Sequence, residues 1–128
     1  MPLISVVLLV MGWSMKKINI VKENRDYSRI IKKNKSFKYK DYIIYIDKKE
    51  PSIYRFGFSV GKKIGNAVMR NRVKRQIKEI VSQNNYKNDF DCIIIVGKGI
   101  LDKSFSEMRD NLNYALKKLD LVKEQKDA

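Results

Sequence analysis

Apolar residues recur with the period of an α-helix in three stretches of the chain, 24–33, 66–83 and 104–119. Asn24, Asn66 and Ser104 stand where side chains commonly cap a first turn, and Ser104 has the capping-box spacing to Glu107. The pattern predicts three amphipathic helices. Their apolar faces are Tyr27, Ile30 and Ile31 in the first, Met69, Val73, Ile77 and Ile80 in the second, and Phe105, Met108, Leu112, Leu116 and Leu119 in the third.

Three other stretches have the pattern of β-strands. In 42–47 and 53–60, successive side chains point to opposite faces, and in 90–96 both faces are apolar, which is typical of an interior strand. Pro51 lies between the first two stretches, and its turn-forming neighbours predict a hairpin that joins them. On the second strand, Arg55 and Ser59 share the face opposite the aromatic one, where they form either a ligand surface or a plain solvated face.

The order of these elements predicts one α+β domain in which helices pack on a sheet, and 128 residues suffice for one hydrophobic core. The tail 121–128 is expected to be disordered. The opening segment 1–14 has no charged side chain, and its residues from Leu3 to Met11 are nearly all apolar. This apolar run is too short to span a bilayer as a helix. We expect it to be an extension outside the fold, with an interfacial anchor as the alternative.

The charge of the chain narrows its partners. A formal net charge of +14, from 28 Lys and Arg against 14 Asp and Glu, favours polyanions: nucleic acid first, an anionic membrane second, an acidic protein third. The chain has no His, and its single Cys, Cys92, lies in the apolar stretch 90–96. This composition excludes an internal disulfide, Cys/His zinc sites and a His base, and it fits a reducing cytoplasm.

The second helix and the residues before it carry seven positive charges between Lys62 and Lys78 without an acid among them. Such a helix is self-repulsive, because no i, i+4 ion pairs support it. Three of the seven arginines of the chain lie within 70–75, and arginine suits bidentate phosphate contacts. Arg70 projects near the apolar sector, so its guanidinium is expected to extend past the core edge. The helix therefore predicts a nucleic-acid surface, with a merely solvated face as the alternative.

The stretch 58–75, FSVGKKIGNAVMRNRVKR, resembles the signature of the bacterial ribonuclease P protein subunit, with its Arg-Asn-Arg motif at Arg70, Asn71 and Arg72. A looser likeness extends from Lys16 to Leu119, within a predicted domain of residues 15–120. The resemblance implies an αβββαβα sandwich with a left-handed βαβ crossover, a fold shared with a ribosomal protein domain. It also implies a further short strand around 37–40.

The resemblance implies the accessory subunit of a cytoplasmic ribonucleoprotein endonuclease that removes the 5′ leader of precursor tRNA. In this family the RNA subunit carries the catalysis with Mg²⁺, so no catalytic residue is expected in the protein. The Mg²⁺ is expected to be bound chiefly by the RNA subunit and the substrate, and no metal ligand is assigned in the protein. The partners are the catalytic RNA and the leader, with no membrane or protein partner predicted. The implied RNA-binding residues are Lys62, Lys63, Asn66, Arg70, Asn71, Arg72, Lys74, Arg75 and Lys78.

The family's leader cleft lies between the first helix and the sheet. Carried over, it includes Tyr27, Ile31, Tyr42, Tyr45, Arg55 and Ser59. The family often has Phe where this chain has Tyr27 and Ile31, and only Tyr27 keeps a stacking surface. Tyr45 is the strongest expected contact, because it points away from the face of Tyr42. Core packing is the competing role for Ile31 and Tyr42. A noncatalytic RNA-binding protein of ribosomal type remains the alternative function, and a basic peripheral membrane protein the third class.

Overall fold

The computed structural model describes residues 19–21, 23–48 and 53–123. The predicted extension 1–14 lies outside this range. The elements in chain order are α2 (Asn24–Lys33), β1 (Ser36–Tyr39), β2 (Tyr42–Lys48), β3 (Arg55–Val60), the 3₁₀ turn η2 (Lys62–Ile64), α3 (Ala67–Ser82), β4 (Phe90–Val96), the 3₁₀ turn η3 (Lys98–Asp102) and α4 (Phe105–Lys118). This order is the α+β arrangement αβββαβα that the resemblance implies.

The four strands form one mixed sheet in the order β1-β2-β4-β3. Antiparallel pairing joins β1 to β2 and β2 to β4, whereas β3 runs parallel to β4, with α3 as the crossover between them. The predicted hairpin between β2 and β3 is therefore wrong, because β4 lies between these two strands. The hairpin of this sheet joins β1 to β2 instead, through a turn in which Lys40 has a φ of 53°.

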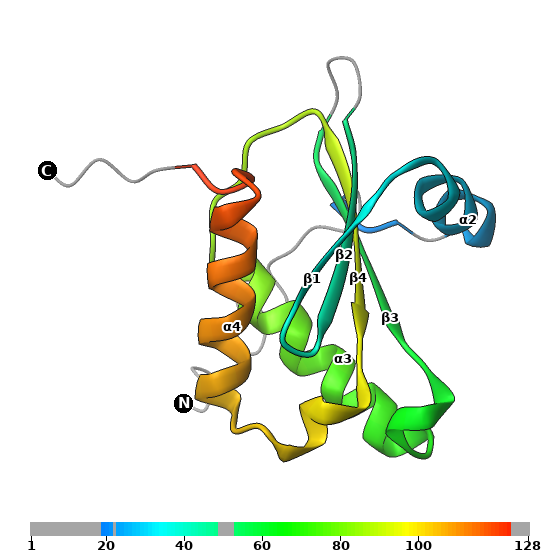
Figure 1. The fold of residues 1–128 in the computed structure, drawn as a ribbon, viewed down its shortest axis with the longest axis vertical. Helices are drawn as coiled ribbons and strands as arrows, with labels where there is room; N and C mark the ends of the chain where they lie inside the picture. The colour runs from blue at the N-terminus through cyan, green and yellow to red at the C-terminus, as the bar shows by residue number, and fades with distance from the viewer. Residues whose placement is uncertain (1–18, 22, 49–52, 124–128) are drawn as a thin grey trace, which may run out of the picture.

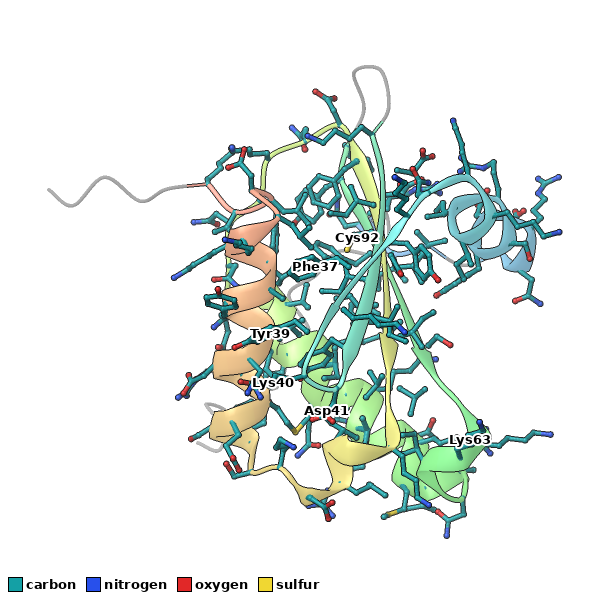
Figure 2. All side chains as sticks on the ribbon, viewed as in Figure 1. Phe37, Tyr39, Lys40, Asp41, Lys63 and Cys92 are labelled. Atoms are coloured by element: carbon teal, nitrogen blue, oxygen red, sulfur yellow. The ribbon has the colours of Figure 1, made fainter. Side chains whose placement is uncertain are left out.

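Helices cover both faces of the sheet, with α2 on one side and α4 on the other (Figure 1). The larger core lies under α3 and α4, and the predicted alternation of β3 is confirmed, since Phe56 and Phe58 are buried in it. Figure 2 shows Cys92 within the sheet, where it is fully buried. Burial raises the pKa of its thiol, so Cys92 serves packing rather than nucleophilic chemistry.

Two of the three residues predicted to cap a helix N-terminus do so in the structure. The side chain of Asn66 accepts a hydrogen bond from Met69 N, and Ser104 and Glu107 form the predicted capping box. Asn24 is instead the first residue of α2, after Glu23, whose side chain makes no capping bond. No helix in the described part of the chain is long and apolar enough to cross a membrane.

The first three residues of the predicted tail 121–128 lie within the described range and contact the rest of the fold. Leu121 is buried in the main core, and Val122 bridges to Tyr86. Lys123 N also donates to Asn85 O at 2.9 Å. The chain therefore packs on the fold at least through Lys123, because the turn after α4 brings the side chain of Leu121 back into the main core. Residues 124–128 lie outside the described range.

Candidate RNA interface

Helix α3 and the turn before it carry seven cations, and we call these cations together with Asn66 and Asn71 the basic surface. Gly65 has a φ of 150°, a conformation that side chains rarely adopt, and it lets the chain turn from η2 into the helix. Figure 2 shows Lys63 at the corner of the molecule that η2 forms. The basic surface comprises all nine predicted RNA-binding residues: Lys62, Lys63, Asn66, Arg70, Asn71, Arg72, Lys74, Arg75 and Lys78.

The cations of the basic surface repel one another without internal compensation. Within the described ranges, the ion pairs involve other residues, and none includes a cation of this surface. Partial burial lowers the pKa of Lys78, and the nearby charge of Lys74 lowers it further. The like charges of this surface are unfavourable to one another, and a bound polyanion would offset their repulsion.

Arg70 lies at the boundary between the basic surface and the core, as predicted. Its Nε is buried and has no hydrogen-bond acceptor among the described residues. The side chain lines a cavity of about 120 Å³ together with Val60, Ala67, Asn71 and Lys74. A buried N–H donor without an acceptor costs free energy, and an oxygen atom from a ligand would remove that cost.

The face of the sheet under α2 holds the predicted leader residues other than Tyr42, and we call it the α2 face. Tyr27, Ile31 and Tyr45 are half-buried around a small second core with Ile93 and Ile95. Ser59 of β3 is also half-buried and lies on the same face of the sheet, where it is paired with Ile95 of β4. The structure thus brings Tyr27, Ile31 and Tyr45 together, and Tyr45 keeps part of its ring exposed.

Tyr27 holds α2 against the sheet edge through its hydroxyl group. This group donates to Val21 O at 3.2 Å and accepts from Phe58 N at 3.1 Å. Burial raises the pKa of Tyr27, while the hydrogen bond from Phe58 acts in the opposite direction. The ring packs directly over Gly57, where a Cβ would lie 2.8 Å from Tyr27 and 2.6 Å from Ile93.

Substitution of Gly57 by alanine is therefore expected to displace Tyr27 and lower the free energy of unfolding by about 1–3 kcal/mol. Urea denaturation measures this change. Gly61→Ala is the matched control, because a Cβ there meets nothing within 4 Å. Equal stability of the two variants would show that Tyr27 is not held over Gly57.

A network of charged residues fastens α2 to the sheet beside these aromatic residues. Arg29 of α2 lies 2.8 Å from Asp47 and 3.6 Å from Asp91. Asp47 and Asp91 are paired across β2 and β4, and Arg55 is paired with Asp91 across β3 and β4. Two buried carboxylates in register would repel each other, and the guanidinium groups offset this repulsion. Asp47, Asp91 and Arg29 were not predicted from the sequence.

Two predicted leader residues have structural roles instead. Tyr42 is only 1% exposed and lies in the main core, on the face opposite Tyr45, where its hydroxyl group donates to Met108 O at 3.0 Å. Tyr42 is thus excluded from the α2 face, because strand alternation directs it toward α4. Arg55 does lie on the α2 face, but Asp91 accepts hydrogen bonds from its Nε and Nη2 at 2.8 and 2.7 Å.

Among the residues that the structure describes, no group of three or more His, Cys, Asp or Glu side chains could hold a metal ion. The basic surface and the α2 face offer positive charge, hydrogen-bond donors and aromatic rings, which can bind and orient a polyanion.

Comparisons with known proteins agree with these features. A family model described as Ribonuclease P matches residues 15–120. The ribonuclease P protein component of Streptococcus agalactiae serotype III is 36% identical over 109 residues, covering 84% of this chain and 100% of that protein. The corresponding protein of Listeria innocua serovar 6a is 40% identical over 108 residues, covering 80% and 89%.

Solved structures show the same similarity. The RNase P protein of Staphylococcus aureus has a TM-score of 0.73 and 31% identity, covering 82% of this chain and 98% of that one. The RNase P protein of Thermotoga maritima has a TM-score of 0.69 and 28% identity, covering 77% and 94%. From its sequence match and its fold, this chain belongs to the ribonuclease P protein component family.

Proposed function

We propose that this protein binds the catalytic RNA subunit of ribonuclease P through the basic surface and the 5′ leader of precursor tRNA on the α2 face. In this role it supports the endonucleolytic removal of the leader that gives the mature tRNA 5′ end. One observation carries the proposal: in the described part of the chain, none of the cations of the basic surface has a carboxylate partner, Arg70 with its buried Nε included.

The chemistry in this proposal belongs to the RNA subunit. Mg²⁺, held chiefly by that RNA and by the substrate, would supply charge stabilisation for hydrolysis of one phosphodiester bond. The protein residues bind and orient. Arg72, Lys74 and Arg75 are exposed and would place positive charge against phosphates, whereas Arg70 is held at the core edge, where its Nε would donate to one phosphate oxygen. A cytoplasmic location is part of the proposal, and it is consistent with the buried free thiol of Cys92.

Reconstitution tests the proposed function against that of a noncatalytic RNA-binding protein. The protein is added to the RNA subunit of its own organism, and leader removal is measured at low Mg²⁺ concentration with and without the protein. We expect faster cleavage and tighter binding of the precursor, because protein cations replace part of the neutralisation that Mg²⁺ supplies. RNA binding without any gain in cleavage or precursor affinity would favour the ribosomal type of function and reject this one.

Tyr45 provides a separate test of the α2 face. Tyr45→Leu keeps an apolar side chain in the second core but removes the ring, so affinity for precursor tRNA should fall by about 1–3 kcal/mol. Tyr45→Phe retains the ring and should bind nearly as the wild type does. Affinity for mature tRNA, which has no leader, serves as the control measurement. A loss for both tRNAs, or none for either, would remove Tyr45 from the leader site.

A further inference from the structure

The apolar stripe of α3 extends one turn beyond the core that covers it. Met69 was predicted to be buried with Val73, yet it is 36% exposed. Its side chain lines a groove of about 310 Å³ between α3 and the corner formed by η3 and the start of α4. This corner lies at the bottom of Figure 1, where the chain passes from β4 to α4.

The walls of this groove combine apolar and cationic side chains. Met69 and Val73 line it from α3, and Leu101, which is 40% exposed, lines it together with Phe105 from the other side. Arg72 and Lys103 also line it. None of its lining residues is acidic, although Asp41 lies 3.2 Å from Lys103 and takes part of that charge. An apolar slot with cations beside it fits a flat, apolar group that is attached to an anion.

The groove adjoins the basic surface, because Arg72 belongs to both. The N-terminus of α4 does not add a second anion site, since Ser104 accepts from Glu107 N and the Glu107 carboxylate accepts from Ser104 N. The positive charge of the groove is therefore that of Arg72, with a smaller share from Lys103. A phosphate bound by Arg72 would hold the attached nucleotide within reach of Met69 and Leu101.

We propose that this groove receives the base of one unpaired nucleotide of the RNA subunit, with Arg72 on the adjoining phosphate. The inference rests on the proposed function and adds a second kind of contact to it. Met69 provides a polarizable side chain that packs well on a ring face. Every base has a flat apolar face that such side chains can contact, so the groove would fix the position of the RNA rather than read its sequence.

A binding experiment with the whole chain and the RNA subunit tests the groove. The double variant Met69→Ala/Leu101→Ala should bind about tenfold more weakly, with an unchanged salt dependence because no phosphate contact is lost. Val68→Ala is the matched control, because Val68 is 76% exposed on α3 but does not line the groove. Thermal unfolding of each variant checks that the fold is retained.

Chemical probing of the RNA at nucleotide resolution gives the second measurement. One unpaired nucleotide should be protected by the wild type and by Val68→Ala, and exposed in the double variant. If the wild type binds RNA but the double variant matches Val68→Ala in affinity and protection, the groove does not bind a base, while the proposed function stands. If the wild type itself does not bind RNA, the proposed function fails first.

The apolar segment 1–14 of the same chain is the other occupant that the groove could receive, although this segment carries no charge to complement Arg72. Deletion of residues 1–14 separates the two cases. We expect the deleted chain to protect the same nucleotide with the same affinity. If the double variant loses affinity only when residues 1–14 are present, the groove holds this segment and the inference is overturned.

Discussion

Replacement of Arg55 by methionine is expected to lower the free energy of unfolding by about 3–5 kcal/mol. Arg55 donates to both carboxylate oxygens of Asp91, and the side chain of Asp91 is 0% exposed. Methionine preserves much of the apolar stem but removes both charged hydrogen bonds. The carboxylate must then stay buried with less compensation, with Arg29 at 3.6 Å, or draw water into the sheet face. Urea denaturation monitored by circular dichroism measures the change.

An exposed ion pair provides the matched control. Arg109 lies 3.3 Å from Asp110 on the surface of α4, where both side chains are well exposed. Arg109→Met should cost no more than about 1 kcal/mol, because water screens the pair. Adding Asp91→Asn to Arg55→Met should recover part of the lost stability, because it removes the buried charge that Arg55 no longer balances. No recovery would mean that packing of the Arg55 stem, rather than its charge, stabilises the sheet.

The pairing of Arg55 with Asp91 could not be predicted from the sequence. The alternation of β3 placed Arg55 opposite Phe56, and that placement is confirmed. Nothing local identifies Asp91 as its partner, because the two residues are 36 positions apart and meet only when β4 enters the sheet beside β3. Asp91 also lies inside a strand whose other residues are apolar, where the predicted pattern gave it no role.

The strand order shows a similar limit. Local pattern and the turn around Pro51 favour a hairpin between β2 and β3, but each strand gains more by pairing with β4. In that position β4 buries both of its apolar faces, which satisfies the pattern that already indicated an interior strand. Helices were easier to predict, because caps such as Asn66 and Ser104 lie within three residues of the groups that they bind.

Among the candidate site residues, charge could be predicted better than depth. Arg72, Lys74 and Arg75 of α3 are exposed as periodicity requires, since Val73, Ile77 and Ile80 are buried on the other side of the helix. The same periodicity misplaced Met69, because the period tells which face a residue occupies but not where the covering layer ends. Here η3 and the start of α4, which cover this side of α3, do not cover its first turn, and a groove remains beside Met69.

Replacement of Arg70, Arg72 and Arg75 together by alanine is expected to produce the largest loss of RNA affinity. Each lost phosphate contact should reduce the slope of log affinity against log salt by about one unit, so three should reduce it by about three. At low salt this corresponds to a loss of roughly two to three orders of magnitude in affinity. Alanine favours helix and removes mutual repulsion, so α3 should remain folded. Filter binding of the RNA subunit over a range of salt concentrations measures both quantities.

The matched control removes the same net charge elsewhere. Lys38, Lys117 and Lys118 are exposed on β1 and α4, and their replacement by alanine also lowers the charge by three. If net charge alone attracted RNA, the two triple variants would lose affinity and salt dependence equally. The basic surface instead predicts a loss confined to the arginine variant, because its three arginines lie close together within 70–75 of α3, and the buried Nε of Arg70 is already held in place. Equal losses of affinity in the two triple variants would show that α3 is only one of several positive patches and not a specific RNA-binding surface.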